Sequence, residues 1–344
     1  MFKRIALPLL MLTLALVCGA CGSDSKEDQA PAKESAAPAG AEKKIVLRGA
    51  TIQDPANPSG KTLYRFAELL NERTNGRITM QVFHSAQLGN ERDELEGLRM
   101  GSLDMCTVAA APMSGFMEKI ALLDLPFLWK DVNHVDTVLE GEIGLKLLKE
   151  MEQYGFIGLG FTENGFRHIT NNKRPIFTPG DMKDIKLRVM ESPISVATWN
   201  AVGCNATPMA WGEVFTALQQ KTVDGQENPI VILDTNRIYE VQKYLSLSRH
   251  SYTPCPFVFS KLRFDKLSPE DQQLILDLGR EMATYHKTLN REMEAASLKV
   301  LLDGGMEVNE IDRDSFMKAM APVYDQFVKD DNKAMIETIL NYKY

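Results

Sequence analysis

The histidines, acidic residues and glycine-rich turns of this chain are the features that could support catalysis or bind a metal. The sequence has no GxSxG nucleophile motif, no Walker A loop and no GxGxxG before a helix. Paired acids such as Glu140 and Glu142 are expected on a solvated helix face. The five histidines are scattered along the sequence and form neither an HExxH pair nor a close Cys/His cluster of the kind that binds zinc. They are His84, His134, His168, His250 and His286. We therefore predict that the protein is not an enzyme and uses no cofactor or metal.

Strand and helix patterns alternate along the chain from residue 45. Alternating or continuous apolar residues predict strands over 45–48, 78–82, 105–108, 156–161, 166–170, 185–190 and 252–260. Spacing of 3.6 residues predicts helices over 63–70, 91–100, 138–148, 194–202 and 211–219. Strands separated by helices indicate parallel pairing, so we predict an α/β sheet.

One predicted helix is much longer than the others. Ser268 is a good N-cap, Pro269 suits the first turn, and Glu270 and Asp271 complement the helix dipole. The helical pattern continues to about Leu302, and a helix of that length spans ~45 Å. This exceeds one small domain, so we expect the helix to brace two lobes.

The N-terminal residues have the features of a bacterial export signal. Two positive residues precede an apolar stretch of thirteen residues (5–17), which spans only ~20 Å as a helix and is too short to cross a membrane. The following Cys18-Gly19-Ala20-Cys21 resembles a lipobox, although Cys18 stands where leucine is usual. We predict a signal peptide over 1–20, lipidation of Cys21 and a flexible tether over 21–43. The alternative is an ordinary cleaved signal.

Composition and charge indicate a soluble globular protein and argue against a nucleic-acid-binding protein. The 344 residues suffice for two domains, and 44% apolar with 25% charged residues is typical of a soluble globular protein. The formal net charge of −7 becomes −9 once the two positive residues of the signal are removed. With no basic block, binding to nucleic acid is not expected. Cys106, Cys204 and Cys255 allow at most one internal disulfide, and we expect them to be buried apolar residues.

Three segments, in order along the chain, resemble the extracytoplasmic solute receptors of tripartite ATP-independent periplasmic (TRAP) transporters, the DctP-type family. The resemblance runs from about Ile45 to the C-terminus, and its last segment is the most specific. The first segment is Gln87-Leu88-Gly89-Asn90-Glu91-Arg92 with Gly101-Ser102-Leu103-Asp104-Met105. The second is Asn164-Gly165-Phe166-Arg167 with Asn171-Asn172-Lys173-Arg174-Pro175-Ile176 and Lys186-Leu187-Arg188-Val189. The third is Ala206-Thr207-Pro208-Met209-Ala210-Trp211 with Val223-Asp224-Gly225-Gln226-Glu227-Asn228-Pro229.

The resemblance implies a two-lobed α/β periplasmic-binding-protein fold, type II-like, with a hinge and a long C-terminal helix that bridges both lobes. On this basis we expect lobe I over 44–165 plus about 253–292. Lobe II is then expected over 166–252 plus about 293–344.

The resemblance also implies a ligand site. Arg188 matches the arginine that grips the substrate carboxylate, and a guanidinium suits this role because its planar fork makes two parallel charge-assisted bonds. Arg167 matches a second arginine, which contacts the carboxylate or positions Arg188; the alternative is an ordinary salt bridge between the lobes. Asn228 matches an asparagine beside the carboxylate, or is a turn residue before proline. Trp211 occupies the place of an aromatic ring in the cleft, or belongs to the core. Glu91 faces the cleft and accepts from substrate hydroxyls, or is a solvated helix start.

The implied function is that of a monomeric periplasmic receptor, anchored to the membrane by its lipid. It would capture an organic acid, either a four-carbon dicarboxylate or a sugar acid such as a uronate, and deliver it to the TRAP membrane permease. Three alternatives remain open: the receptor of an ATP-driven importer, a secreted lipoprotein enzyme acting on carboxylated sugars, and a sensory receptor.

Overall fold

The computed structural model describes residues 44–343. The predicted signal peptide, lipidated Cys21 and tether lie outside the described residues. The strands are β1 (Ile45–Ala50), β2 (Ile78–Phe83), β3 (Met105–Thr107), β4 (Phe156–Asn171), β5 (Lys186–Val189), β6 (Asn205–Pro208), β7 (Gly225–Pro229), β8 (Tyr244–Leu247), β9 (Tyr252–Ser260) and β10 (Glu307–Glu310).

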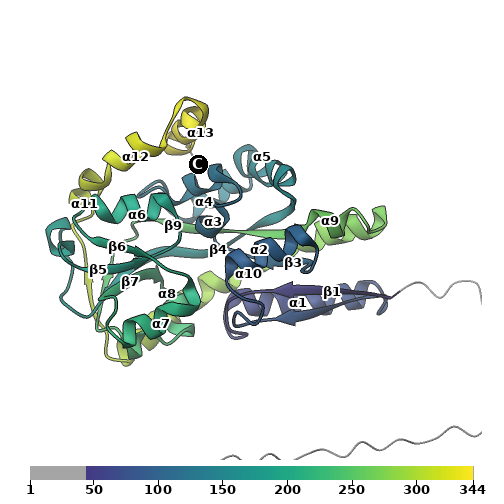
Figure 1. Cartoon of the computed structure of the whole chain (residues 1–344), viewed down its shortest axis with the longest axis horizontal. Coiled ribbons are helices and arrows are strands. Elements are labelled where there is room, and N and C mark those ends of the chain that lie inside the picture. Colours follow the sequence, from purple (N-terminus) through teal and green to yellow (C-terminus); the bar gives the residue numbers. More distant parts are fainter. Residues whose placement is uncertain (1–43, 344) are drawn as a thin grey trace, which may run out of the picture. The chain divides into compact units, whose positions relative to one another are not determined.

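Helices cover both halves of this sheet (Figure 1). The α-helices are α1 (Pro58–Arg73), α2 (Glu91–Met100), α3 (Ala110–Met113), α4 (Val132–Leu139), α5 (Glu142–Glu150), α6 (Pro193–Asn200), α7 (Trp211–Gln219), α8 (Ile230–Thr235), α9 (Lys261–Phe264), α10 (Pro269–Asp303), α11 (Arg313–Met320), α12 (Pro322–Phe327) and α13 (Asp330–Asn341). Short 3-10 helices are η1 (Glu118–Asp124), η2 (Met151–Tyr154), η3 (Pro179–Met182) and η4 (Ile238–Glu240).

The sheet has the order β2-β1-β3-β9-β4-β7-β5-β6, and β8 joins β4 to β10. Its outer pairs β1–β2, β1–β3, β5–β6 and β8–β10 are parallel, as the sequence predicts. Its centre is antiparallel, because β9 runs against both β3 and β4, and β4 runs against β7 and β8. The prediction of parallel pairing is therefore wrong for the centre of the sheet.

The long strand β4 connects two lobes. The sequence predicts two strands, over 156–161 and 166–170, but one continuous strand covers 156–171. Its first part, as far as Phe166, pairs with β9, and its last part, from Arg167, pairs with β7 and β8. A register shift near Gly165, whose φ is +106°, lies just before this change of partners. The chain thus passes between lobes inside a strand, and the fold is the expected two-lobed α/β fold.

A second difference concerns the helix predicted over 138–148. Two helices, α4 and α5, replace it, with Gly141 as the N-cap of the second. A Cβ on Gly144 would lie 1.8 Å from the carbonyl oxygen of Leu139, so the tight approach of α5 to the end of α4 requires glycine there. The helical spacing of apolar residues continues across this break, and the sequence pattern therefore predicts a single helix.

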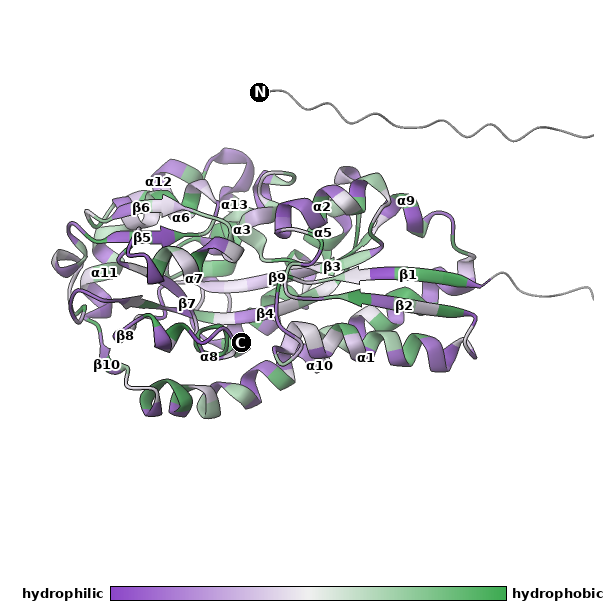
Figure 2. Ribbon diagram, turned by 60° about the horizontal axis from the view of Figure 1, so that its bottom comes forward, coloured by the Kyte–Doolittle hydropathy of each residue, from purple (hydrophilic) through white to green (hydrophobic). Residues whose placement is uncertain are grey.

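Helix α10 is the predicted brace between the lobes. It begins after Ser268, whose Oγ accepts from the backbone N–H of Asp271 at 3.2 Å, and covers 35 residues. It contacts α1 in one lobe, β4 in the middle and α8 in the other lobe. Figure 2 shows it passing along β4 and β9. None of the described helices is long and apolar enough to cross a membrane.

The C-terminal helices contact both lobes in turn. Phe316 and Met320 of α11 pack in the core that contains β5. Val323 of α12 and Ile336 and Ile339 of α13 pack instead in the core that contains η1 and α4. His134 of α4 lies 2.9 Å from the carbonyl oxygen of Ile339, through its Nε2. The chain therefore returns to the first lobe at its end.

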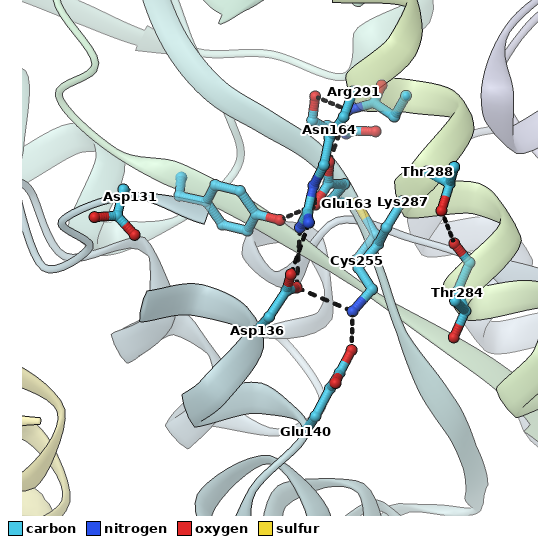
Figure 3. Close-up of polar contacts among 12 residues, drawn as sticks. Asp131, Asp136, Glu140, Glu163, Asn164, Cys255, Thr284, Lys287, Thr288 and Arg291 are labelled. Carbon is cyan, nitrogen blue, oxygen red and sulfur yellow. Dashed lines mark hydrogen bonds and ion pairs between the residues drawn. The ribbon is translucent and has the colours of Figure 1, made fainter. Parts of the chain in front are cut away.

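A buried polar network joins α10 to the point where β4 changes partners (Figure 3). The carboxylate of Glu163, 1% exposed, accepts from Arg291 Nη2 at 2.7 Å, from Asn290 at 3.1 Å and from the Tyr252 hydroxyl. Arg291 also donates to Asp136 of α4 at 2.6 Å. These contacts fix the long helix to the hinge.

The three described cysteines, Cys106, Cys204 and Cys255, are buried free thiols, which confirms their prediction as small core residues. Among residues 44–343 there is no group of three or more His, Cys, Asp or Glu side chains placed to hold a metal ion.

Candidate functional site

Arg188 is a buried cation that forms no salt bridge within residues 44–343. It lies on β5, is 3% exposed, and stacks on Trp211 with its guanidinium carbon 5.6 Å from the ring centre. Its Nε and Nη2 donate to the carbonyl oxygen of Met209 at 2.9 and 2.6 Å. No carboxylate of the described chain forms a salt bridge with it, and burial lowers its pKa to about 10. A buried guanidinium that lacks a salt bridge has an electrostatic preference for a nearby anion.

Arg167, by contrast, has protein partners for four of its five N–H groups. Its Nε and Nη2 donate to the carboxylate of Glu227, Nη2 also reaches the Glu227 carbonyl, and Nη1 donates to Thr253 Oγ1 at 3.0 Å. Both members of this ion pair are buried, at 1% and 2% exposure. Burial alone would raise the pKa of Glu227. The charge of Arg167 and the hydrogen bond from His250 outweigh burial and lower this pKa to about 2.

Trp211 contacts Arg188, whereas Asn228 has a contact only within its own strand. Trp211 is the first residue of α7, half-buried, and its ring covers the Arg188 guanidinium. Asn228 is buried on β7 next to Glu227 and donates to Gln226 Oε1 at 2.6 Å. The Trp211 ring thus forms part of the surroundings of the buried cation.

Glu91 faces these groups from the other lobe. It is the first residue of α2, and its Oε1 accepts from the backbone N–H of Ala109 at 2.7 Å. Desolvation raises its pKa to about 7, against the opposing effect of Ala109, Arg188 and Arg167. It lines a small pocket with hydroxyl and amide side chains from Thr51, Gln53, Ser59, Thr107 and Asn164.

Reasoning from the sequence missed several groups that surround the site. Glu227, which pairs with Arg167, and His250, which bonds to Glu227, are among them. Glu227 lies inside the third family segment but carries no local signal of its own. Asp124 is another. It is the only acid in the apolar run 120–129, and this isolation is a signal that could have marked it. It is 5% exposed, and neither carboxylate oxygen has a hydrogen-bond partner.

The buried carboxyls predict how stability varies with pH. Burial raises the pKa of Asp124 to about 8 and of Glu91 to about 7, so the folded protein keeps protons that the unfolded chain has lost. Stability must then fall as the pH rises through this range. His168 and His286, whose pKa is lowered to about 3 by burial, contribute little above pH 7 because the unfolded chain is also mostly deprotonated there.

We therefore expect the free energy of unfolding to be smaller at pH 8.5 than at pH 7, measured by chemical denaturation. Asp124→Asn removes one of the titrating groups and should reduce the difference. A free energy of unfolding that rises over this interval contradicts the assignment.

A two-lobed fold with a hinge strand and a bridging helix, and with a buried arginine on β5 that forms no salt bridge in the described chain, is compatible with a solute receptor. The chain belongs to the family of bacterial extracellular solute-binding proteins, family 7 (DctP), whose sequence profile matches residues 49–331. It is a periplasmic solute receptor of the TRAP type, as the sequence resemblance predicts. The family consists of solute-binding receptors, and nothing supports the ATP-driven importer or the enzyme alternatives.

Three relatives illustrate the match. A solute-binding protein of Verminephrobacter eiseniae is 41% identical over 281 residues, covering 81% of this chain and 84% of its own. The 2,3-diketo-L-gulonate-binding periplasmic protein of Escherichia coli K12 is 37% identical, covering 77% and 82%. The crystal structure of a TRAP periplasmic solute-binding protein from Polaromonas sp. JS666, bound to D-erythronate, superposes with a TM-score of 0.85 at 36% identity, covering 88% of this chain and 100% of that chain.

Proposed function

We propose that this receptor binds an organic acid through a direct contact between the ligand carboxylate and Arg188. The observation that supports this most strongly is the buried Arg188 guanidinium, which has two bonds to one carbonyl oxygen and no carboxylate partner among the described residues. A carboxylate supplies the missing charge and accepts from the remaining N–H groups. Relatives that bind D-erythronate and 2,3-diketo-L-gulonate, both organic acids, support the same ligand class.

The other predicted site residues take the following roles in this proposal. Arg167 positions the site through its bonds to Glu227, since four of its N–H groups already have partners within the protein. Asn228 contributes its amide beside the carboxylate, and the Trp211 ring packs against the carbon chain of the acid. Glu91 accepts from ligand hydroxyl groups.

We further propose that the lobes close on the acid about the hinge in β4. Lobe I then comprises 44–165, about 253–292 and the C-terminal helices from Pro322, and lobe II comprises 166–252 and about 293–321. This division differs from the sequence-based expectation in the C-terminal helices, because α13 packs on α4. Closure of this kind is a hinge motion that presents a new surface to a partner.

The closed receptor would deliver its acid, as a monomer, to the membrane subunits of a TRAP permease. Lipidation at Cys21 would keep it at the membrane, with residues 22–43 as a tether. Mass spectrometry of the exported protein tests the anchor: a diacylglyceryl mass at an N-terminal Cys21 supports it, and an unmodified N-terminus contradicts it.

A thermal-shift screen of the mature receptor tests the ligand class. The panel holds aldonates and uronates of four to six carbons, C4 dicarboxylates, and neutral sugars and amines as controls. A ligand at 100 times its Kd stabilises the folded state by about 2.7 kcal/mol, which raises Tm by roughly 4 °C for a chain of this size. A shift with a neutral sugar or an amine, and none with any acid, contradicts the proposal.

A further inference from the structure

Asp124 is a buried carboxyl group whose polar atoms the protein leaves without partners. It ends η1, is 5% exposed, and neither Oδ1 nor Oδ2 has a hydrogen bond. Buried polar groups are normally satisfied, so an exception calls for a partner that is absent from the folded chain alone. In a receptor, a ligand is such a partner.

The surroundings of Asp124 belong to the ligand site. The charged groups that act on its pKa are Arg167, Glu227 and Glu91. The loop that follows η1 is bonded to the same region, because the backbone N–H of Phe127 donates to the carbonyl oxygen of His250 at 2.7 Å. His250 in turn bonds to Glu227. Asp124 at the end of η1 is therefore within electrostatic reach of the Arg167–Glu227 pair and of Glu91, and the loop that follows it bonds to His250.

The protonation state of Asp124 suits a hydroxyl group. Burial raises its pKa to about 8, so at neutral pH it is mostly a neutral carboxylic acid. Such a group has one O–H donor together with acceptor lone pairs. An alcohol also donates and accepts, so the two can form complementary bonds.

The charges of the site favour one carboxylate only. Glu227 neutralises Arg167, and Arg188 is the buried cation left without a partner in the described chain. A second ligand carboxylate would be buried beside Glu91 and Asp124 without a cation of its own, which is unfavourable. A hydroxyl in that place carries no such penalty.

We propose that Asp124 is a specificity-determining residue that hydrogen-bonds a ligand hydroxyl, so that the site selects a hydroxylated monocarboxylate over a dicarboxylate. This inference rests on the proposed function, because it assumes that Arg188 holds the carboxylate.

Glu94 provides a matched control. It is also a buried acid, 1% exposed, with both carboxylate oxygens unpartnered. It lies on α2, and its pKa is raised by burial and by Glu91 and Asp93, with no contribution from Arg167 or Arg188. The two residues are alike in burial and differ in their relation to the arginines.

The experiment compares Asp124→Leu and Asp124→Asn with Glu94→Met and Glu94→Gln. Calorimetry measures Kd for four- to six-carbon aldonates and uronates, and for succinate and fumarate, and the Tm of each unliganded variant is recorded. The wild type should bind its preferred hydroxy acid at least about 100-fold more tightly than either dicarboxylate. Asp124→Leu should weaken that hydroxy acid by about 10- to 100-fold without lowering Tm, because it removes an unsatisfied buried group. Asp124→Asn, which keeps a donor and an acceptor, should remain within about fivefold of the wild type.

Both Glu94 variants should leave Kd within about threefold of the wild type, since no ligand group is expected to reach them. The inference is overturned if the wild type prefers a dicarboxylate, if Asp124→Leu binds the hydroxy acid normally, or if Asp124→Leu lowers Tm where Glu94→Met does not. A wild type that binds no organic acid overturns the proposed function as well. Normal acid binding with an inert Asp124 overturns only the present inference.

Discussion

The Arg188→Ala protein is expected to fold normally and to bind its organic acid at least about 10²- to 10³-fold more weakly than the wild type. A buried carboxylate that loses its charge partner costs ~3–5 kcal/mol, which corresponds to this loss of affinity. The fold should survive because no carboxylate of the described chain depends on Arg188; only its bonds to Met209 and its contact with Trp211 are lost. Calorimetry with the acid found in the ligand screen measures the affinity, and Tm measures the fold.

Two further substitutions sharpen this test. Arg188→Lys keeps the charge but loses the planar fork, so its affinity should lie between those of the wild type and Arg188→Ala. Arg65→Ala removes an exposed arginine on α1 that pairs only with Glu68, and should leave the affinity unchanged. If the Arg188→Ala protein binds the acid with near-normal affinity, the proposed contact between Arg188 and the ligand carboxylate is contradicted.

The second large effect is expected at Glu227 and concerns stability. Glu227→Leu leaves the buried Arg167 guanidinium without its carboxylate, and His250 without its acceptor. Breaking a buried ion pair from one side costs ~3–5 kcal/mol, so Tm should fall by roughly 5–8 °C. Differential scanning calorimetry of the unliganded protein measures this loss.

The double variant Arg167→Met/Glu227→Leu serves as the control. Replacing both partners of a buried pair by apolar residues of similar volume is close to neutral, so most of the lost Tm should return. Its affinity for the acid then separates the two roles of Arg167 that the sequence leaves open. Retained binding identifies Arg167 as a positioning residue, whereas a loss as large as that of Arg188→Ala indicates contact with the ligand. A double variant as unstable as Glu227→Leu contradicts the pairing argument.

Elements with clear local signals could be predicted closely from the sequence. Helix α2 covers 91–100 as predicted, because Asn90 forms a capping box and Gly101 ends the helix in the left-handed conformation. Helix α7 and strand β9 also have the predicted bounds. Short strands such as β6 and β10, four residues each, could not be predicted, because they exist only through pairing with distant neighbours.

The continuity of β4 and the composition of the site depend on the same kind of distant contact. No local sequence pattern indicates that β4 pairs with β9 as far as Phe166 and with β7 and β8 after it. A guanidinium can bind a carboxylate through two parallel hydrogen bonds, but this holds for every arginine in the chain. Only the family resemblance distinguishes Arg188 from the other arginines. The lack of a salt bridge to Arg188 among the described residues, and the ion pair between Arg167 and Glu227, follow from three-dimensional packing and have no counterpart in residue spacing.

The number of chain crossings has a kinematic consequence. In the division of lobes proposed above, the chain passes between the lobes in β4, at β9, along α10 and again among the C-terminal helices. Two bodies joined at several separate points keep few relative degrees of freedom, so twisting and sliding are suppressed and rotation about one axis remains. A single distance, between one spectroscopic label on α5 and another on α7, would then report the complete opening and closing trajectory of the receptor.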